Sequence, residues 1–327
     1  MSKRKEHTRH HYIPQCYLRN FTEDGKCVWV YDKARSKSYH TAISSICYKD
    51  DFYKIEKESL PQTDEKINGL TIETVFFARG IENIYSQLLS EFISKIDEAI
   101  LAEEITQTII DRNVKKALAT QIAIQFLRLP EIREAVENIQ KVTRQSVENF
   151  LKRNNMYNAD GGKRVMKQVE IPPDPVLNHC FFGYGNENLV NEFANKLCNN
   201  YWNLYITTGD YFFTSDFPIS VEPHVKDAQQ ECMGLAQYGG VVTFPISKKI
   251  LLKIMDCRYF SDYGESDGRC FIAEPMFVRQ ENIRQYLYAR EIVVSANNDF
   301  SFLSFIKQIN GSEVSEHPNY GITSNWI

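Results

Sequence analysis

The sequence lacks the features that mark membrane and secreted proteins. Its longest apolar stretches, 240–245 and 250–254, are far shorter than the roughly 18–20 residues that a membrane-spanning helix needs. The basic N-terminus leads into His, Tyr and Pro residues instead of an apolar run, which is not the pattern of a signal peptide. We therefore expect a cytoplasmic protein with no membrane partner.

Several enzyme motifs are missing as well. The sequence has no GxxxxGKS/T phosphate loop, no GxGxxG after a strand, no GxSxG elbow and no HExxH motif. These absences argue against P-loop nucleotide hydrolases, Rossmann-type oxidoreductases, α/β-hydrolases and zincins. The eight cysteines include no CxxC pair, which argues against a zinc ribbon or finger.

The composition is that of an ordinary globular protein, with 43% hydrophobic and 24% charged residues in 327. The formal net charge of −4 means that nucleic acid could be bound only through local basic patches. One patch contains Lys3, Arg4, Lys5 and Arg9, and a second spans 140–170. Such charge runs are usually solvated surfaces, and binding of the nucleic-acid backbone is the functional alternative.

Hydrophobic periodicity predicts an α+β fold, because strands precede and follow a helical middle region. We expect one compact unit over 1–327, in which the helical region packs with an N-terminal β unit and a mostly antiparallel C-terminal sheet. The Gly- and Pro-rich stretch 157–175 is interpreted as a loop and a candidate internal boundary. The main predicted strands are 26–31, 43–48, 51–55, 202–207, 212–214, 241–245, 250–255 and 291–295, and the main helices lie within 62–101, 111–129, 131–154, 187–199 and 278–289.

Two adjacent histidines, His10 and His11, open an amphipathic segment whose apolar residues can anchor it to a core. Histidine changes charge near neutral pH and is a common metal ligand, so an anchored imidazole suits proton transfer or coordination. The alternative is a pair that only hydrogen-bonds within the fold. Asp216 follows a predicted strand, where clefts are often built, but an Asp before Phe-Pro also suits a turn.

Arg128 shares one helix face with Gln121 and Gln125, beside an apolar face. Its planar guanidinium would suit a phosphate or carboxylate, although pairing with an acid such as Glu131 or Glu82 is an equal alternative.

Glu73 and Glu82 are nine residues apart, a spacing that places them near the same α-helical face only if Gly80 breaks the helix. Solvent-facing glutamates are the ordinary interpretation. Together with His11 and Asp216, they are nevertheless the candidates for binding a divalent metal ion.

The chain resembles a bacterial family catalogued as domain of unknown function 4238. The resemblance is carried by His10-His11-Tyr12-Ile13-Pro14 with Tyr17, Leu18 and Phe21, and by the segments 28–33 (VWVYDK), 121–130 (QIAIQFLRLP), 214–218 (TSDFP) and 244–247 (FPIS). The resemblance implies a set of shared polar residues but assigns them no reaction. Of that set this sequence keeps His10, His11, Arg128 and Asp216, and Glu73 and Glu82 stand where the family tends to have acids.

These residues suggest two functions. In the first, the chain is a nuclease that serves in phage defence or as a toxin: His11 acts as general base or metal ligand, Asp216 orients it or binds a divalent ion, and Arg128 stabilises charge on the phosphate. In the second, the chain is a non-catalytic binding or regulatory protein, and the same residues form a buried structural network. The nuclease hypothesis requires that His11, Arg128 and Asp216 meet in space.

Overall fold

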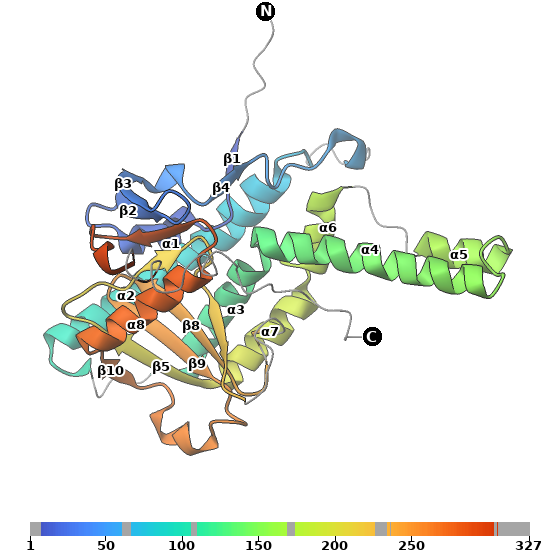
Figure 1. Cartoon of the computed structure of the whole chain (residues 1–327). Helices are drawn as coiled ribbons and strands as arrows, with labels where there is room; N and C mark the ends of the chain where they lie inside the picture. Colours follow the sequence, from blue (N-terminus) through green and yellow to red (C-terminus); the bar gives the residue numbers. More distant parts are fainter. Residues whose placement is uncertain are drawn as a thin grey trace, which may run out of the picture.

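The computed structural model describes residues 8–60, 67–105, 110–168, 174–225, 234–235, 237–303 and 306. It has the α+β fold predicted from the sequence, with strands from both ends of the chain around a helical middle region (Figure 1). Within these residues, no helix combines the length and the apolar character that crossing a membrane requires.

The larger sheet has five strands in the order β10-β5-β9-β8-β7, and only the β10–β5 pair is parallel. Helix α8 lies on one face of this sheet, where Glu281 pairs with Lys253 at 2.7 Å, and α7 lies on the other, where the indole of Trp202 donates to the Leu197 carbonyl (Figure 1). Because both faces are covered, every residue of β8 is buried. The strands are β5 (Tyr201–Ile206), β7 (Ser220–Pro223), β8 (Gly240–Ser247), β9 (Ile250–Met255) and β10 (Cys270–Ile272).

A second sheet, of order β3-β2-β11-β6, joins the two ends of the chain. Val30 in β2 pairs with Val294 in β11, and Val294 also pairs with Thr214 in β6. The N-terminal strands thus share a sheet with C-terminal ones, a point on which the sequence was silent. The strands are β2 (Cys27–Asp32), β3 (Lys37–Ala42), β6 (Thr214–Ser215) and β11 (Ile292–Ser295).

The predicted strands 43–48 and 51–55 are wrong in most of their length. Residues 43–45 form a 3-10 turn, and the strand near them is β4 (Tyr48–Asp50), which pairs with β1 (Arg9–His11). Cys47 and Asp51 both have positive φ, at 52° and 56°, so the backbone turns on each side of β4.

The helical region follows the prediction closely. Asp111 caps α3 by accepting from the backbone N–H groups of Asn113 and Val114, and Pro130 separates α3 from α4 by occupying the first turn of α4. Helix α4 extends well beyond the body of the protein and carries α5 along its outer part, so that the two form a projecting arm (Figure 1). The longer helices are α3 (Arg112–Leu127), α4 (Pro130–Arg153), α6 (Pro175–Phe182), α7 (Glu187–Asn199) and α8 (Pro275–Tyr288).

Helix α5 (Asp160–Gln168) corrects the prediction of a loop over 157–175. Its two glycines suggested a loop, but one of them is required by close packing: a Cβ on Gly162 would lie 2.0 Å from the Met156 carbonyl oxygen. Short helical elements among the described residues are α1 (Gln15–Leu18), η1 (Arg19–Phe21), η2 (Ile43–Ser45), η3 (Lys57–Ser59) and η7 (Ser261–Ser266).

Candidate functional site

The candidate site is built around a π-helix, η4 (Ile72–Ile81), which continues directly into the α-helix α2 (Glu82–Leu101). A π-helix closes i→i+5 hydrogen bonds and has about 4.4 residues per turn, so residues nine apart are separated by roughly two full turns. Glu73 and Glu82 therefore lie on the same side, close enough for Glu82 to raise the pKa of Glu73. A helix break at Gly80, the condition under which the sequence would align the two glutamates, is not needed, because Gly80 lies within the π-helix.

Arg128 follows the end of α3 and is fully buried beside the two glutamates, with 1% of its surface exposed. Its Nη1 donates to Glu82 Oε1 at 3.0 Å, its Nη2 to the His11 carbonyl at 2.6 Å, and its Nε to the Tyr53 hydroxyl at 3.1 Å. The guanidinium carbon also lies 3.8 Å from the centre of the Phe77 ring. Arg128 thus ties β1, the π-helix and α3 together, and it pairs with Glu82, one of the acids proposed from the sequence.

The two histidines lie in β1 and are both buried. His10 Nδ1 accepts from the Tyr53 backbone N–H at 2.8 Å, and its ring stacks on that of Tyr53. His11 Nδ1 lies 3.4 Å from Gln15 Nε2, which can only donate. Burial lowers the pKa of both imidazoles; for His11, Glu82 opposes this effect and Arg128 adds to it. Both histidines are therefore neutral at neutral pH.

Several buried polar atoms around Arg128 have no hydrogen-bond partner among the described residues. They include one carboxylate oxygen of Glu73, the Tyr85 hydroxyl, both side-chain amide atoms of Gln125 and Nε2 of His10. Tyr85 and Gln125 are each 1% exposed. Buried polar groups are nearly always paired, so such a concentration of unpaired ones indicates a place where water or a ligand completes the structure.

Glu73 has the chemistry of a proton-transfer group. Burial raises the pKa of its carboxyl to about 7; Glu82 adds to this shift, while Arg128 opposes it. A carboxyl with this pKa exists in both protonation states near neutral pH, which is what a general acid or base requires.

Asp216 is held in a different set of contacts. Its carboxylate accepts from the backbone N–H groups of Arg290 at 2.8 Å, Glu291 at 2.7 Å and Ile292 at 3.3 Å. Burial raises its pKa to about 7, although these three bonds act in the opposite direction. In the described parts of the chain, no hydrogen bond or ion pair links Asp216 to His10, His11 or Arg128.

The two groups of residues are nevertheless neighbours. Tyr12, which follows His11 in the chain, lies within electrostatic range of both Asp216 and Glu131. Glu131 in turn pairs with Arg290 at 2.8 Å, and not with Arg128. The structure thus brings together His11, Glu73, Glu82 and Arg128. Asp216 fixes the segment that leads into β11, within electrostatic range of Tyr12.

The metal candidates do not gather into a coordination site. Among the described residues, no three His, Cys, Asp or Glu side chains are placed to hold one metal ion. Beside Glu73 and Glu82 lies the guanidinium of Arg128, which occupies the position that a cation would take next to two carboxylates.

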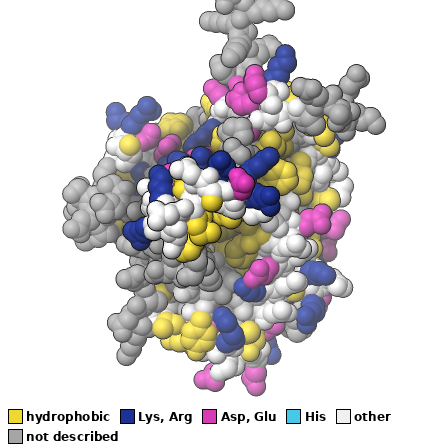
Figure 2. Space-filling view, turned by 90° about the vertical axis from the view of Figure 1, so that its right-hand side faces the viewer, with side chains coloured by type: hydrophobic (Ala, Val, Ile, Leu, Met, Phe, Trp, Pro, Cys, Tyr) yellow, Lys and Arg dark blue, Asp and Glu magenta, His cyan; other side chains and the backbone are white. Residues whose placement is uncertain are grey.

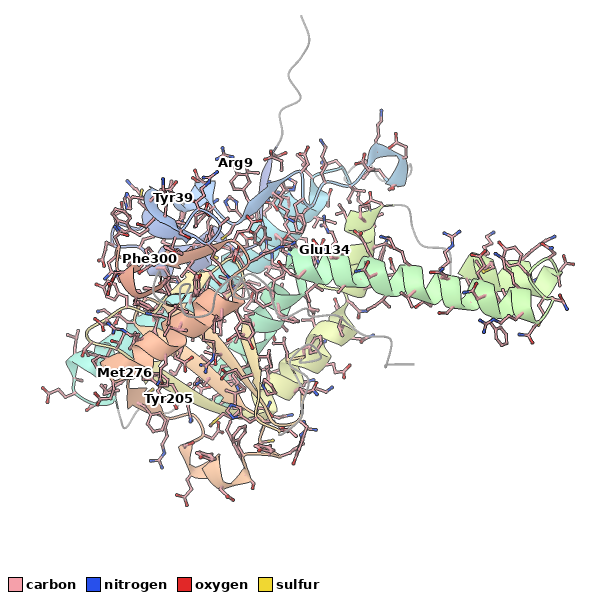
Figure 3. All side chains as sticks on the ribbon, in the orientation of Figure 1. Arg9, Tyr39, Glu134, Tyr205, Met276 and Phe300 are labelled. Carbon is pink, nitrogen blue, oxygen red and sulfur yellow. The ribbon has the colours of Figure 1, made fainter. Side chains whose placement is uncertain are left out.

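Sequence reasoning missed Tyr53, which connects His10 and Arg128 through its backbone N–H and its hydroxyl. The predicted strand 51–55 gave Tyr53 no distinguishing role, and nothing in its sequence neighbourhood could have supplied one. Of the basic residues proposed from the sequence, Arg9 lies near the site, exposed at the start of β1 (Figure 3), and its charge also lowers the pKa of His11. Lys3, Arg4 and Lys5 lie outside the described residues, and the described part of the patch over 140–170 falls on the projecting arm.

A comparison with family models matches residues 9–299 of the chain to a family described as "Protein of unknown function (DUF4238)". No curated protein and no solved structure matches the chain. The match includes β1, both glutamates, Arg128 and Asp216, and it extends over most of the sequence. The chain belongs to the DUF4238 family of proteins of unknown function.

Proposed function

We propose that the chain is a hydrolase that cleaves phosphodiester bonds in nucleic acid, and that the reaction takes place at Glu73, Glu82, His11 and Arg128. The observation that supports this most directly is the unlike environment of the two carboxyls. Burial favours a proton on Glu73, whereas Glu82 is paired with Arg128. Two carboxyls whose environments differ in this way are a common basis for acid–base catalysis.

In this proposal Glu73 transfers the proton. A water molecule attacks the phosphorus and gives a proton to the Glu73 carboxylate. The bond between phosphorus and the leaving oxygen then breaks, and that oxygen takes the proton from the Glu73 carboxyl. Glu82 holds Arg128 in place, and the positive charge of Arg128 stabilises the negative charge that develops on the phosphate. We assign this exchange to the carboxylate oxygen of Glu73 that is buried and lacks a partner among the described residues.

Substrate binding would come from the remaining positive groups near the site. A guanidinium has five N–H groups on three nitrogens, and each nitrogen of Arg128 donates one hydrogen bond within the described part of the protein. Arg9 is exposed next to the histidines and would bind the phosphate backbone from the solvent side. A role in phage defence or as a toxin belongs to this same proposal and depends on the activity.

The test is hydrolysis of labelled single-stranded RNA and of single- and double-stranded DNA by the full chain, with and without Mg²⁺, Mn²⁺ and EDTA. We expect Glu73→Gln to lower the rate at least about 100-fold, because Gln cannot carry the proton. Glu91→Gln, a change at an exposed position of α2, is the matched control and should keep full activity. Wild-type protein that cleaves none of these substrates, or Glu73→Gln protein that cleaves them normally, would overturn the proposal.

A non-catalytic binding or regulatory protein is the second candidate. The observation that favours it is that Asp216 and Arg128 are buried and each make three hydrogen bonds within the protein. If substitutions of His11 and Asp216 by alanine lower the melting temperature strongly and the stable wild type shows no hydrolysis, the network is structural. Intact thermal stability together with lost activity would support the hydrolase.

A further inference from the structure

The arm formed by α4 and α5 presents a helical face whose outer part is exposed. The first turns of α4 are anchored by Ile132 and Val136, which are buried, and α4 packs against α6 in this region. Farther along α4, Leu151 is again buried, at 3%, but the large apolar residues beside this buried stripe are exposed: Phe150 at 62%, Val142 at 48% and Ile139 at 38%. An exposed apolar stripe of this size indicates a contact surface for another molecule.

This exposed face, which we call the arm face, carries no charge. The charged residues of the same stretch, Lys141, Arg144 and Glu148, lie on the opposite side of the helix by its period of 3.6 residues. Figure 2, seen toward the free end of the arm, shows hydrophobic side chains along its lower edge with Lys and Arg above them. The arm face consists of the exposed residues Ile139, Val142, Ser146, Asn149 and Phe150 and the half-buried residues Gln140, Thr143 and Val147.

The sequence of the arm face is nearly a palindrome in its chemistry. When 139–150 (IQKVTRQSVENF) is read from both ends, Ile139 matches Phe150, Gln140 matches Asn149, Val142 matches Val147 and Thr143 matches Ser146. Large apolar residues stand at both ends and small hydroxyl residues at the centre.

A twofold axis sets residue i of one copy against residue j of the other, and j against i, so a face with large apolar residues at both ends can match them with each other. Two antiparallel copies of α4 crossing between Arg144 and Gln145 would set Ile139 of each copy against Phe150 of the other. Thr143 and Ser146 would lie near the axis, where small side chains allow two helices to approach closely.

We propose that the arm face is a dimer interface, in which α4 pairs with α4 of a second copy of this chain in antiparallel direction. An acidic peptide is less well suited, because the arm face has no cation to receive it. A nucleic acid is less well suited for the same reason, since phosphate binding needs Lys or Arg on the contact face.

The contact is small, since it involves about three turns of one helix from each copy. Stable interfaces usually bury about 1,200–2,000 Å² in total, so we expect a dimer that dissociates in the micromolar range. The proposal concerns the assembly of the chain and does not depend on the proposed hydrolase activity.

The experiment is sedimentation equilibrium of the full chain over roughly 1–200 µM, a range chosen to bracket micromolar dissociation. We expect the wild type to change from monomer to dimer, and Ile139→Lys and Phe150→Glu each to remain monomeric throughout. Both residues are exposed, so the variants should keep the wild-type melting temperature. Leu101→Glu, at a residue that is 85% exposed on α2, is the control and should dimerise like the wild type.

Mixing the two variants tests the antiparallel direction. In an antiparallel pair, the lysine introduced by Ile139→Lys in one copy faces the glutamate introduced by Phe150→Glu in the other. The second half of the interface is native, so a heterodimer should form from two monomeric proteins. Parallel pairing would not place these positions together. A wild type that is monomeric at all concentrations, a dimer unaffected by both substitutions, or a mixture that stays monomeric would each overturn the proposal.

Discussion

Replacement of Arg128 by Met tests whether the buried guanidinium is the main link between β1, the π-helix and α3. The side chains have similar length, so the change removes the charge and the donors with little change in shape. Each hydrogen bond from a charged donor contributes about 1.5–3 kcal/mol, and Arg128 has three such bonds besides its contact with Phe77. Their sum overstates the loss, because burying the guanidinium itself costs several kcal/mol that Met does not incur.

Removing one member of a buried ion pair typically costs about 3–5 kcal/mol. The Glu82 side chain is 25% exposed and can regain some hydration, which places Arg128→Met at the lower end, about 3 kcal/mol. Urea unfolding with linear extrapolation measures the loss. Arg153→Met, at an exposed arginine of α4, is the control and should change the free energy of unfolding by less than about 0.5 kcal/mol. A loss below about 1 kcal/mol for Arg128→Met would refute the reasoning.

Two further effects can be measured in the same way. Burial raises the pKa of Asp216 to about 7, above its unfolded value, so the stability that Asp216 confers is greatest at low pH and is lost as the pH rises through 7. The free energy of unfolding should therefore fall by on the order of 2–3 kcal/mol between about pH 5 and pH 8, and Glu73 should contribute in the same direction. An Asp216→Asn variant that keeps the full pH dependence would contradict this assignment. Tyr17→Phe should lower the free energy of unfolding by about 1–3 kcal/mol. The buried Tyr17 hydroxyl hydrogen-bonds with Thr214 Oγ1 and with the Pro245 carbonyl, at 2.7 Å each, and both groups would lose this partner. A Tyr17→Phe variant with the melting temperature of the wild type would speak against this.

The elements that the sequence predicted well are those with a strong hydrophobic periodicity and a residue that ends the helix or strand locally. Helix α7 was predicted with its observed bounds, and α3 and α4 were separated correctly by Pro130. Strand β2 was found from its aromatic and β-branched residues. Its partner β3 was missed because Lys37–Ala42 is a polar, largely exposed edge strand, which has no apolar alternation to detect.

The candidate site was predicted only in part, and the reason is geometric. Glu73 and Glu82 were placed by the α-helical period, under which nine residues put them on opposite faces, and no sequence pattern signals a π-helix. The pairing of Arg128 with Glu82 was one of two alternatives that the sequence left open, and the structure selects it. Asp216 was grouped with His11 on the hypothesis that the two meet in one cleft, yet its contacts are with the backbone of 290–292.

The position of β2 has a consequence for synthesis of the chain. Its outer neighbour β3 follows at once, but its inner neighbour β11 begins at Ile292. At about 5–20 residues per second, a ribosome needs on the order of 10–50 s to make the residues between them. During that time β2 presents an unpaired edge, the kind of surface on which strands of other chains can pair. The nascent chain therefore carries this exposed edge on the ribosome until β11 has been made.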